Sequence, residues 1–152
     1  MSRPATIVDT NVVVAGLLTS QDNSPVARIL DGMLSAAFPF VVSEALLAEY
    51  RAVLVRSGLR NLHRLTVDEV DAILTDLAQP AIVLVVVATI PAPDSGDQFL
   101  WDLLAVRADL VLVTGDKQLL REATMRGRVI SPASFVGLGS GSSECTAGRR
   151  GC

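Results

Sequence analysis

Four acidic residues stand where a folded chain could use them together to bind a metal ion. Asp9 follows directly on a short apolar run, and Asp116 follows another within the segment VLVTGD. Asp97 comes at the start of an expected helix after a proline-rich loop, and Glu49 lies inside another expected helix. Carboxylates that are not accompanied by histidine or cysteine suit hard divalent cations such as Mg²⁺ or Mn²⁺. The pattern therefore indicates a cation site built from oxygen ligands.

Each acid also has a simpler explanation when it is taken alone. An aspartate at the start of a helix is commonly an N-cap, and this applies to Asp9, Asp97 and Asp116. Glu49 alone is most simply a solvated helix residue, and Glu44 is an alternative to it near the same helix N-terminus. The joint pattern favours a site, because converging carboxylates at apolar strand ends are costly to desolvate and repel one another unless a cation is present.

The elements that would position these acids alternate between apolar runs of strand length and longer stretches of helical period. This alternation predicts an α/β fold with a parallel sheet. We expect strands at 5–8, 38–42, 82–87, 110–113 and 129–130, and helices at 12–18, 25–34, 43–56, 66–79, 97–106, 117–125 and 132–136. The β-branched strand 82–87 is expected to be buried on both faces. Because ligands gather at the carboxyl ends of parallel strands, Asp9 and Asp116 should share one edge of the sheet.

Length and composition set the broader class. The 152 residues fit a single domain, which we place at residues 1–137, followed by a glycine- and serine-rich tail at 138–152 that we expect to be disordered. Cys145 and Cys152 both fall in that tail, and the first residues lack the apolar stretch of a signal peptide. The most apolar run, Ala81–Ile90, is about half as long as a membrane helix. These features predict a cytoplasmic protein with no membrane contact.

The motifs, taken in order, resemble those of a known family. Asp-Thr-Asn after the first strand, an E-x-x-x-x-E helix, the loop P-D-S-G-D before F-L-W, and V-T-G-D are together similar to the PIN-domain nucleases, and in particular to VapC-type toxins of bacterial toxin–antitoxin systems. The resemblance runs from about residue 5 to residue 136. It implies a three-layer α/β/α fold with a central parallel sheet of about five strands.

The resemblance also implies roles for individual residues. The metal-binding positions would be Asp9, Glu49, Asp97 and Asp116, with Asp94 as a further candidate ligand and Asn11 and Thr114 as supporting polar residues. The activity would be Mg²⁺- or Mn²⁺-dependent hydrolysis of RNA phosphodiester bonds. Lys117 adjoins a candidate ligand and is our candidate for a phosphate contact. A homodimer and a cognate antitoxin are the protein partners that the resemblance implies.

Other readings stay open beside this one. The nearest is a non-catalytic PIN-like domain that binds RNA or protein, although the chain keeps all four acids. A phosphotransfer enzyme with Asp9 as nucleophile would carry the motif D-x-D, whereas Asn11 is an amide. A dinucleotide-binding domain lacks its G-x-G-x-x-G loop. The net charge of −3 does not choose between a small-molecule enzyme and a nuclease with a concentrated acidic site.

Overall fold

The computed structural model describes residues 5–85, 98–121 and 128–137. The strands are β1 (Thr6–Val8), β2 (Val41–Val42), β3 (Ile82–Val83), β4 (Val111–Val113) and β5 (Val129–Ile130). The helices are α1 (Thr10–Leu18), α2 (Pro25–Leu34), α3 (Glu44–Leu54), α4 (Ser57–His63), α5 (Val67–Ala78), α6 (Gln98–Leu104) and α7 (Lys117–Leu120). Residues 132–137 are also helical. The predicted α/β class is confirmed.

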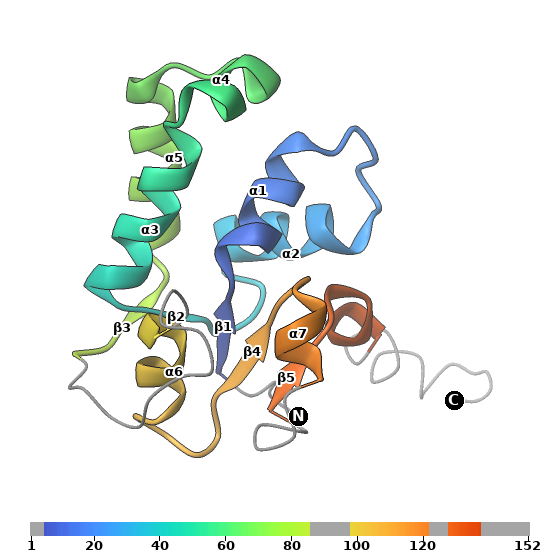
Figure 1. Ribbon diagram of the computed structural model, residues 1–152, viewed down its shortest axis with the longest axis vertical. Coiled ribbons are helices and arrows are strands. Elements are labelled where there is room, and N and C mark those ends of the chain that lie inside the picture. The colour runs from blue at the N-terminus through green and yellow to red at the C-terminus, as the bar shows by residue number, and fades with distance from the viewer. Residues whose placement is uncertain (1–4, 86–97, 122–127, 138–152) are drawn as a thin grey trace.

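All strand pairings in this part of the chain are parallel. One sheet has the order β1-β4-β5, and β2 pairs with β3 in a second sheet. A parallel bridge between Thr6 and Phe40 connects the two sheets. The order across the five strands is therefore β3-β2-β1-β4-β5, with β1 near the middle of the molecule (Figure 1).

This order reverses direction between β1 and β4. The chain moves outward from β1 through β2 to β3, and then returns to the other side of β1 with β4 and β5. Parallel sheets of this kind leave a crevice beyond the carboxyl ends of the two strands at the reversal, because their connections diverge there. Asp9 follows β1 and Asp116 follows β4 by three residues, so both acids stand at this crevice.

The expectation that strand 82–87 is buried on both faces is wrong for the residues described. Ile82 is 37% exposed, Val83 62% and Val85 92%. The physical reason is position, since β3 is the outer strand of its pair and has β2 on one side only. Apolar, β-branched composition predicts a strand but does not separate a central strand from an edge strand.

Several helices begin at a polar side chain that caps them. Ser24 and Ser43 accept backbone N–H groups of α2 and α3, and Thr66 forms a capping box with Glu69. Gly16 lets α1 lie close to α2, because a Cβ there would come 2.9 Å from the Val26 carbonyl oxygen. This close approach packs α1 against α2, and α1 starts at the crevice with Asp9 as its N-cap.

One helix was not predicted, and several predicted segments lie outside the described residues. The short helix α4 was not predicted from the sequence. The predicted tail at 138–152 and the loop that holds Asp94 and Asp97 lie outside the described residues, as do residues 122–125 of the predicted helix 117–125. Among the helices that the structure describes, none has the length and apolar character needed to cross a membrane.

Candidate metal centre

Asp9 is fixed at the junction of β1 and α1. Its backbone N–H donates to the Val113 carbonyl of β4 at 2.9 Å. Its Oδ1 accepts the Thr10 N–H at 2.7 Å, and its Oδ2 accepts the Thr114 hydroxyl at 2.7 Å. The residue is only 7% exposed. One carboxylate oxygen is therefore held by the start of a helix and the other by the end of the neighbouring strand.

Thr114 and Asn11 connect the two strand ends. The Thr114 hydroxyl donates to Asp9 and also accepts the backbone N–H of Asp116 at 3.0 Å. Asn11 accepts the Gly115 N–H at 3.1 Å, and its amide nitrogen lies 3.4 Å from both Asp9 Oδ2 and Thr114 Oγ1. This network holds the Asp116 backbone in register with Asp9, which is the placement expected of supporting polar residues.

Three of the predicted acids meet at one pocket. Asp116 caps α7 by accepting the Gln118 N–H at 2.8 Å, and Glu49 projects from the middle of α3. The pocket has a volume of about 430 Å³. Its lining combines acidic, other polar and apolar residues: Asp9, Glu49, Asp116, Thr10, Asn11, Val14, Ala15, Leu18 and Val53.

The electrostatics of this pocket disfavour the ionised form of Asp9. Burial is the largest cause that raises the pKa of Asp9 above its ordinary value of 3.8, while the hydrogen bonds from Thr114 and Thr10 lower it. The negative charges of Asp116 and Glu49 raise the pKa further. No cationic side chain of the described residues contributes to this balance. A bound cation would offset the burial and the repulsion together.

The donor set fits Mg²⁺ or Mn²⁺. The polar atoms that line the pocket come from carboxylate, hydroxyl and amide groups. Thr10 is only 6% exposed, and its buried hydroxyl finds no hydrogen-bond partner in the described part of the chain. Within that part, no three acidic, histidine or cysteine side chains are close enough to form a metal cluster. Mg²⁺ typically uses one or two carboxylates and keeps several waters, so the pair of strand-end aspartates suffices chemically.

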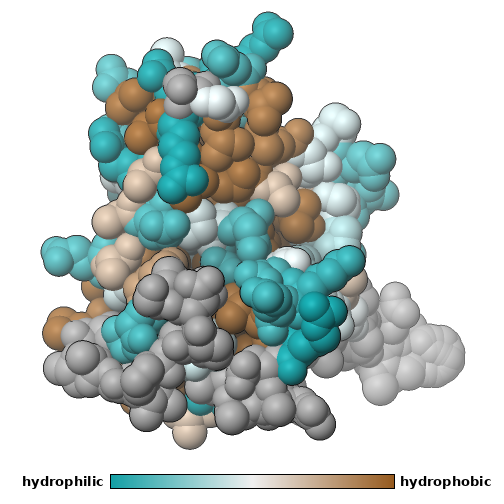
Figure 2. Space-filling view, viewed as in Figure 1, coloured by the Kyte–Doolittle hydropathy of each residue, from teal (hydrophilic) through white to brown (hydrophobic). Residues whose placement is uncertain are grey.

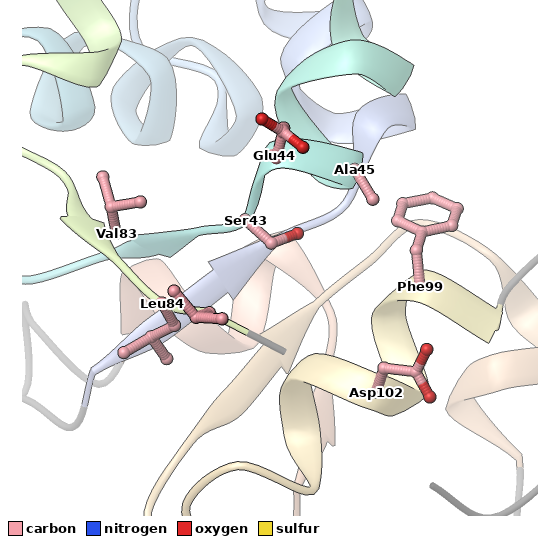
Figure 3. Close-up of a pocket in the computed structure, with 8 residues that line it drawn as sticks. Ser43, Glu44, Ala45, Val83, Leu84, Phe99 and Asp102 are labelled. Atoms are coloured by element: carbon pink, nitrogen blue, oxygen red, sulfur yellow. The ribbon is translucent and has the colours of Figure 1, made fainter. Parts of the chain in front are cut away.

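Glu44, the alternative to Glu49, lines a different pocket. Five residues along a helix correspond to a rotation of about 140°, so the two glutamates point to different sides of α3. Figure 3 shows Glu44 at a pocket that it shares with Ser43, Phe99 and Asp102. Of the two glutamates, Glu49 is the one that lines the pocket with Asp9 and Asp116.

Lys117 lies beside this site on the solvent side. It is the first residue of α7 and is exposed. It forms no ion pair with any residue the structure describes, so its ammonium group is available to an anion.

Tyr50 contributes to the site in a way that the sequence analysis did not predict. Its hydroxyl donates to the Val8 carbonyl at 2.5 Å, and its side chain is fully buried. The bond joins the residue before Asp9 to the residue after Glu49. Burial, and secondarily the charge of Asp9, raise the pKa of Tyr50 so that it stays a neutral donor. A single tyrosine on an otherwise apolar helix face is the one sequence signal for such a bond, because a buried phenol usually needs a partner.

Replacing Tyr50 with phenylalanine is expected to lower the free energy of unfolding by about 1–3 kcal/mol, because the buried Val8 carbonyl loses its donor. Urea unfolding monitored by circular dichroism measures this loss. Leu74→Val, a change in the core on α5, serves as a control for altered packing. An unfolding midpoint that does not move for Tyr50→Phe would show that the hydrogen bond contributes nothing to the connection between β1 and α3.

Comparison with known proteins agrees with this geometry. Residues 5–118 match the sequence profile of the PIN domain. No curated protein matches the chain significantly. The matched region extends from β1 to the first residues of α7, so it includes both strand ends at the crevice. PIN domains are nuclease-type domains and are commonly metal-dependent ribonucleases. The chain belongs to the PIN domain family.

Proposed function

We propose that this chain is a Mg²⁺- or Mn²⁺-dependent endoribonuclease that hydrolyses RNA phosphodiester bonds. The observation that carries the proposal is the buried Asp9 carboxylate, which shares one pocket with Asp116 and Glu49 and has no cationic partner in the described chain. Repulsion between these carboxylates does not stabilise the fold. A site that binds a divalent cation nevertheless needs such a group of unpaired carboxylates, because they must stay available to the ion.

The metal-binding residues in this proposal are those of the sequence analysis. Asp9 and Asp116 would hold the ion from the two strand ends, with Glu49 at the α3 side of the same pocket. Asp97, and Asp94 as a further candidate ligand, would act from the segment outside the described residues. When bound, the ion supplies Lewis acidity, which neutralises charge on the phosphate and makes hydroxide available near neutral pH.

The remaining polar groups of the site would orient the metal-binding carboxylates or contact the substrate. Thr114 holds Oδ2 of Asp9 in place, and Asn11 keeps the Gly115 turn against the start of α1. Lys117 would contact a substrate phosphate, since it is exposed beside Asp116. Catalysis by such a site depends on positioning, so these hydrogen bonds are part of the proposed machinery even though they do not touch substrate.

The biological setting is also part of the proposal. The motif set resembles VapC-type toxins, and this supports a role as the toxin of a toxin–antitoxin system, acting as a cytoplasmic homodimer that a cognate antitoxin inhibits. Induced expression in a bacterial host should arrest growth if this holds. Co-expression of the protein encoded by the neighbouring reading frame should relieve the arrest.

An RNA cleavage assay tests the activity. Purified protein is incubated with labelled structured and single-stranded RNAs in Mg²⁺, Mn²⁺ or EDTA. Cleavage should require the metal and should be lost in Asp116→Asn. Asp31→Asn removes an exposed acid of α2 away from the pocket and should cleave like wild type. If wild-type protein binds these RNAs but leaves all of them intact in either metal, the non-catalytic RNA-binding function replaces this proposal.

A further inference from the structure

Three arginines recur every four residues along α4 and its two ends. Arg56 precedes the helix, Arg60 lies within it and Arg64 follows it. The Arg60 N–H donates to the Arg56 carbonyl at 2.9 Å, and the Arg64 N–H donates to the Arg60 carbonyl at 2.9 Å. These two hydrogen bonds place the three backbone positions at helical spacing, about 6 Å apart along the axis. We call these three residues the arginine row.

Unlike Arg51, Arg107 and Arg128, the arginine row has no partner in the part of the chain that the structure describes. Arg51 pairs with Asp71 at 2.7 Å, and Arg107 pairs with Asp109 at 2.6 Å. Arg128 donates to three backbone carbonyls. The three members of the row are exposed and form no ion pair or side-chain hydrogen bond within residues 5–85, 98–121 and 128–137. In a chain of net charge −3, this is a local concentration of unneutralised positive charge.

The end of the row is built with unusual backbone geometry. Arg64 has a φ of 61°, a left-handed conformation that is uncommon for residues other than glycine. His63 holds this turn with both ring nitrogens: Nε2 lies 2.8 Å from the Leu54 carbonyl of α3, and Nδ1 accepts the Leu65 N–H at 3.0 Å. The turn is therefore fixed to α3.

A concave surface lies beside the row. A cavity of about 390 Å³ is lined by Arg60, Asn61, Arg64, Leu65 and Thr66. Two acids, Asp68 and Glu69, stand in the first turn of α5, but neither lines this cavity. The cavity thus offers two guanidinium groups and an amide to an anion.

The arginine row belongs to a helix that packs against two of the helices lining the metal pocket. Helix α4 contacts both α1 and α3, and these two helices provide the apolar end of that pocket through Leu18 and Val53. Figure 1 shows α4 at the end of α3 that points away from the strands. In the same view, Figure 2 shows apolar surface in the region of α1 and α4, with polar side chains around it.

We propose that the arginine row binds the sugar–phosphate backbone of the RNA on one side of the scissile bond. This inference rests on the proposed function, because it assigns a path to the same substrate. The negative charge of a polynucleotide complements the three free guanidinium groups, and their regular spacing suits a repeating phosphate backbone. The apolar surface between pocket and row then faces the nucleosides, which favours single-stranded RNA with unpaired bases.

Binding of a fluorescein-labelled single-stranded RNA, measured by anisotropy in EDTA over a range of salt concentrations, tests this path. Arg60→Gln and Arg64→Gln should each reduce the slope of log Kd against log salt by about one, and the double variant by about two. The double variant should bind about tenfold or more weakly. Arg28→Gln removes another exposed, unpaired helical arginine, on α2, and should leave both affinity and slope unchanged.

The outcomes separate the two proposals. If wild-type protein binds and cleaves RNA but Arg60→Gln behaves like Arg28→Gln, the backbone path is wrong and the ribonuclease function stands. If wild-type protein neither cleaves RNA in Mg²⁺ or Mn²⁺ nor binds it in EDTA, the ribonuclease function fails and the path fails with it. Thermal unfolding of each variant near the wild-type temperature shows that a loss of binding does not come from a loss of fold.

Discussion

Asp9→Asn is expected to lower kcat for metal-dependent RNA cleavage by more than about 100-fold and, at the same time, to stabilise the metal-free protein. Loss of an outer-shell partner already costs about 10–100-fold in metal affinity or activity, and Asp9 is proposed as a direct ligand. Asparagine has the same shape and can still accept the Thr10 N–H. It carries no charge, so the burial penalty and the repulsion from Asp116 and Glu49 disappear.

The two effects of this variant are measured separately. Single-turnover cleavage of one RNA substrate gives the rate, and thermal unfolding in EDTA near pH 7.5 gives the stability. Asp31→Asn on α2 is the matched control, because it removes one negative charge from an exposed position. A variant that is both inactive and less stable would show that Asp9 acts mainly as the N-cap of α1, in the role that its bond to Thr10 also permits.

Part of the site could be predicted from the sequence. Asp9 and Asp116 could be placed together because apolar runs identify parallel strands, and the carboxyl ends of parallel strands meet at one edge. The choice of Glu49 over Glu44 depends on helix register, which becomes definite only once Ser43 is seen to cap α3. The sequence indicates the helical spacing of α3, and the structure shows which of its residues face the pocket.

Other parts of the fold could not be predicted, for identifiable reasons. Helix α4 has only seven residues, begins with Ser-Gly and has no side-chain cap at Arg56, so neither period nor capping indicates it. The exposure of Val83 follows from the place of β3 at the edge of its sheet, and composition does not encode that place. The bond from Tyr50 to Val8 joins residues 42 positions apart, and no local pattern reports such a partner.

The stability of the metal-free protein should depend on pH through Asp9, with a sign that follows from its raised pKa. Folded Asp9 binds its proton more tightly than unfolded Asp9 does. Its favourable contribution is therefore fully present below the ordinary value of 3.8 and is lost as the pH rises through the raised, folded-state pKa. The exposed acids Asp71 and Asp109 have lowered pKa values and act in the opposite sense at low pH. Subtracting the free energy of unfolding of wild type from that of Asp9→Asn cancels the contribution of these exposed acids. This difference in favour of the variant should grow as the pH is raised from about 4 to 8.

Mn²⁺ or Mg²⁺ should reverse this loss of stability at neutral pH. An ion present at about 100 times its Kd stabilises the folded state by about 2.7 kcal/mol, which corresponds to an increase in Tm of roughly 5–10 °C for a chain of this size. The increase should shrink as the pH falls toward 4, because protonated carboxylates do not bind the ion. Thermal unfolding in Mn²⁺, Mg²⁺ and EDTA measures it, with Asp9→Asn and Asp31→Asn in parallel. The first variant should lose the increase and the second should keep it. An equal increase in wild type and Asp9→Asn would place the ion elsewhere on the protein and would remove the basis for assigning the crevice between β1 and β4 as the metal centre.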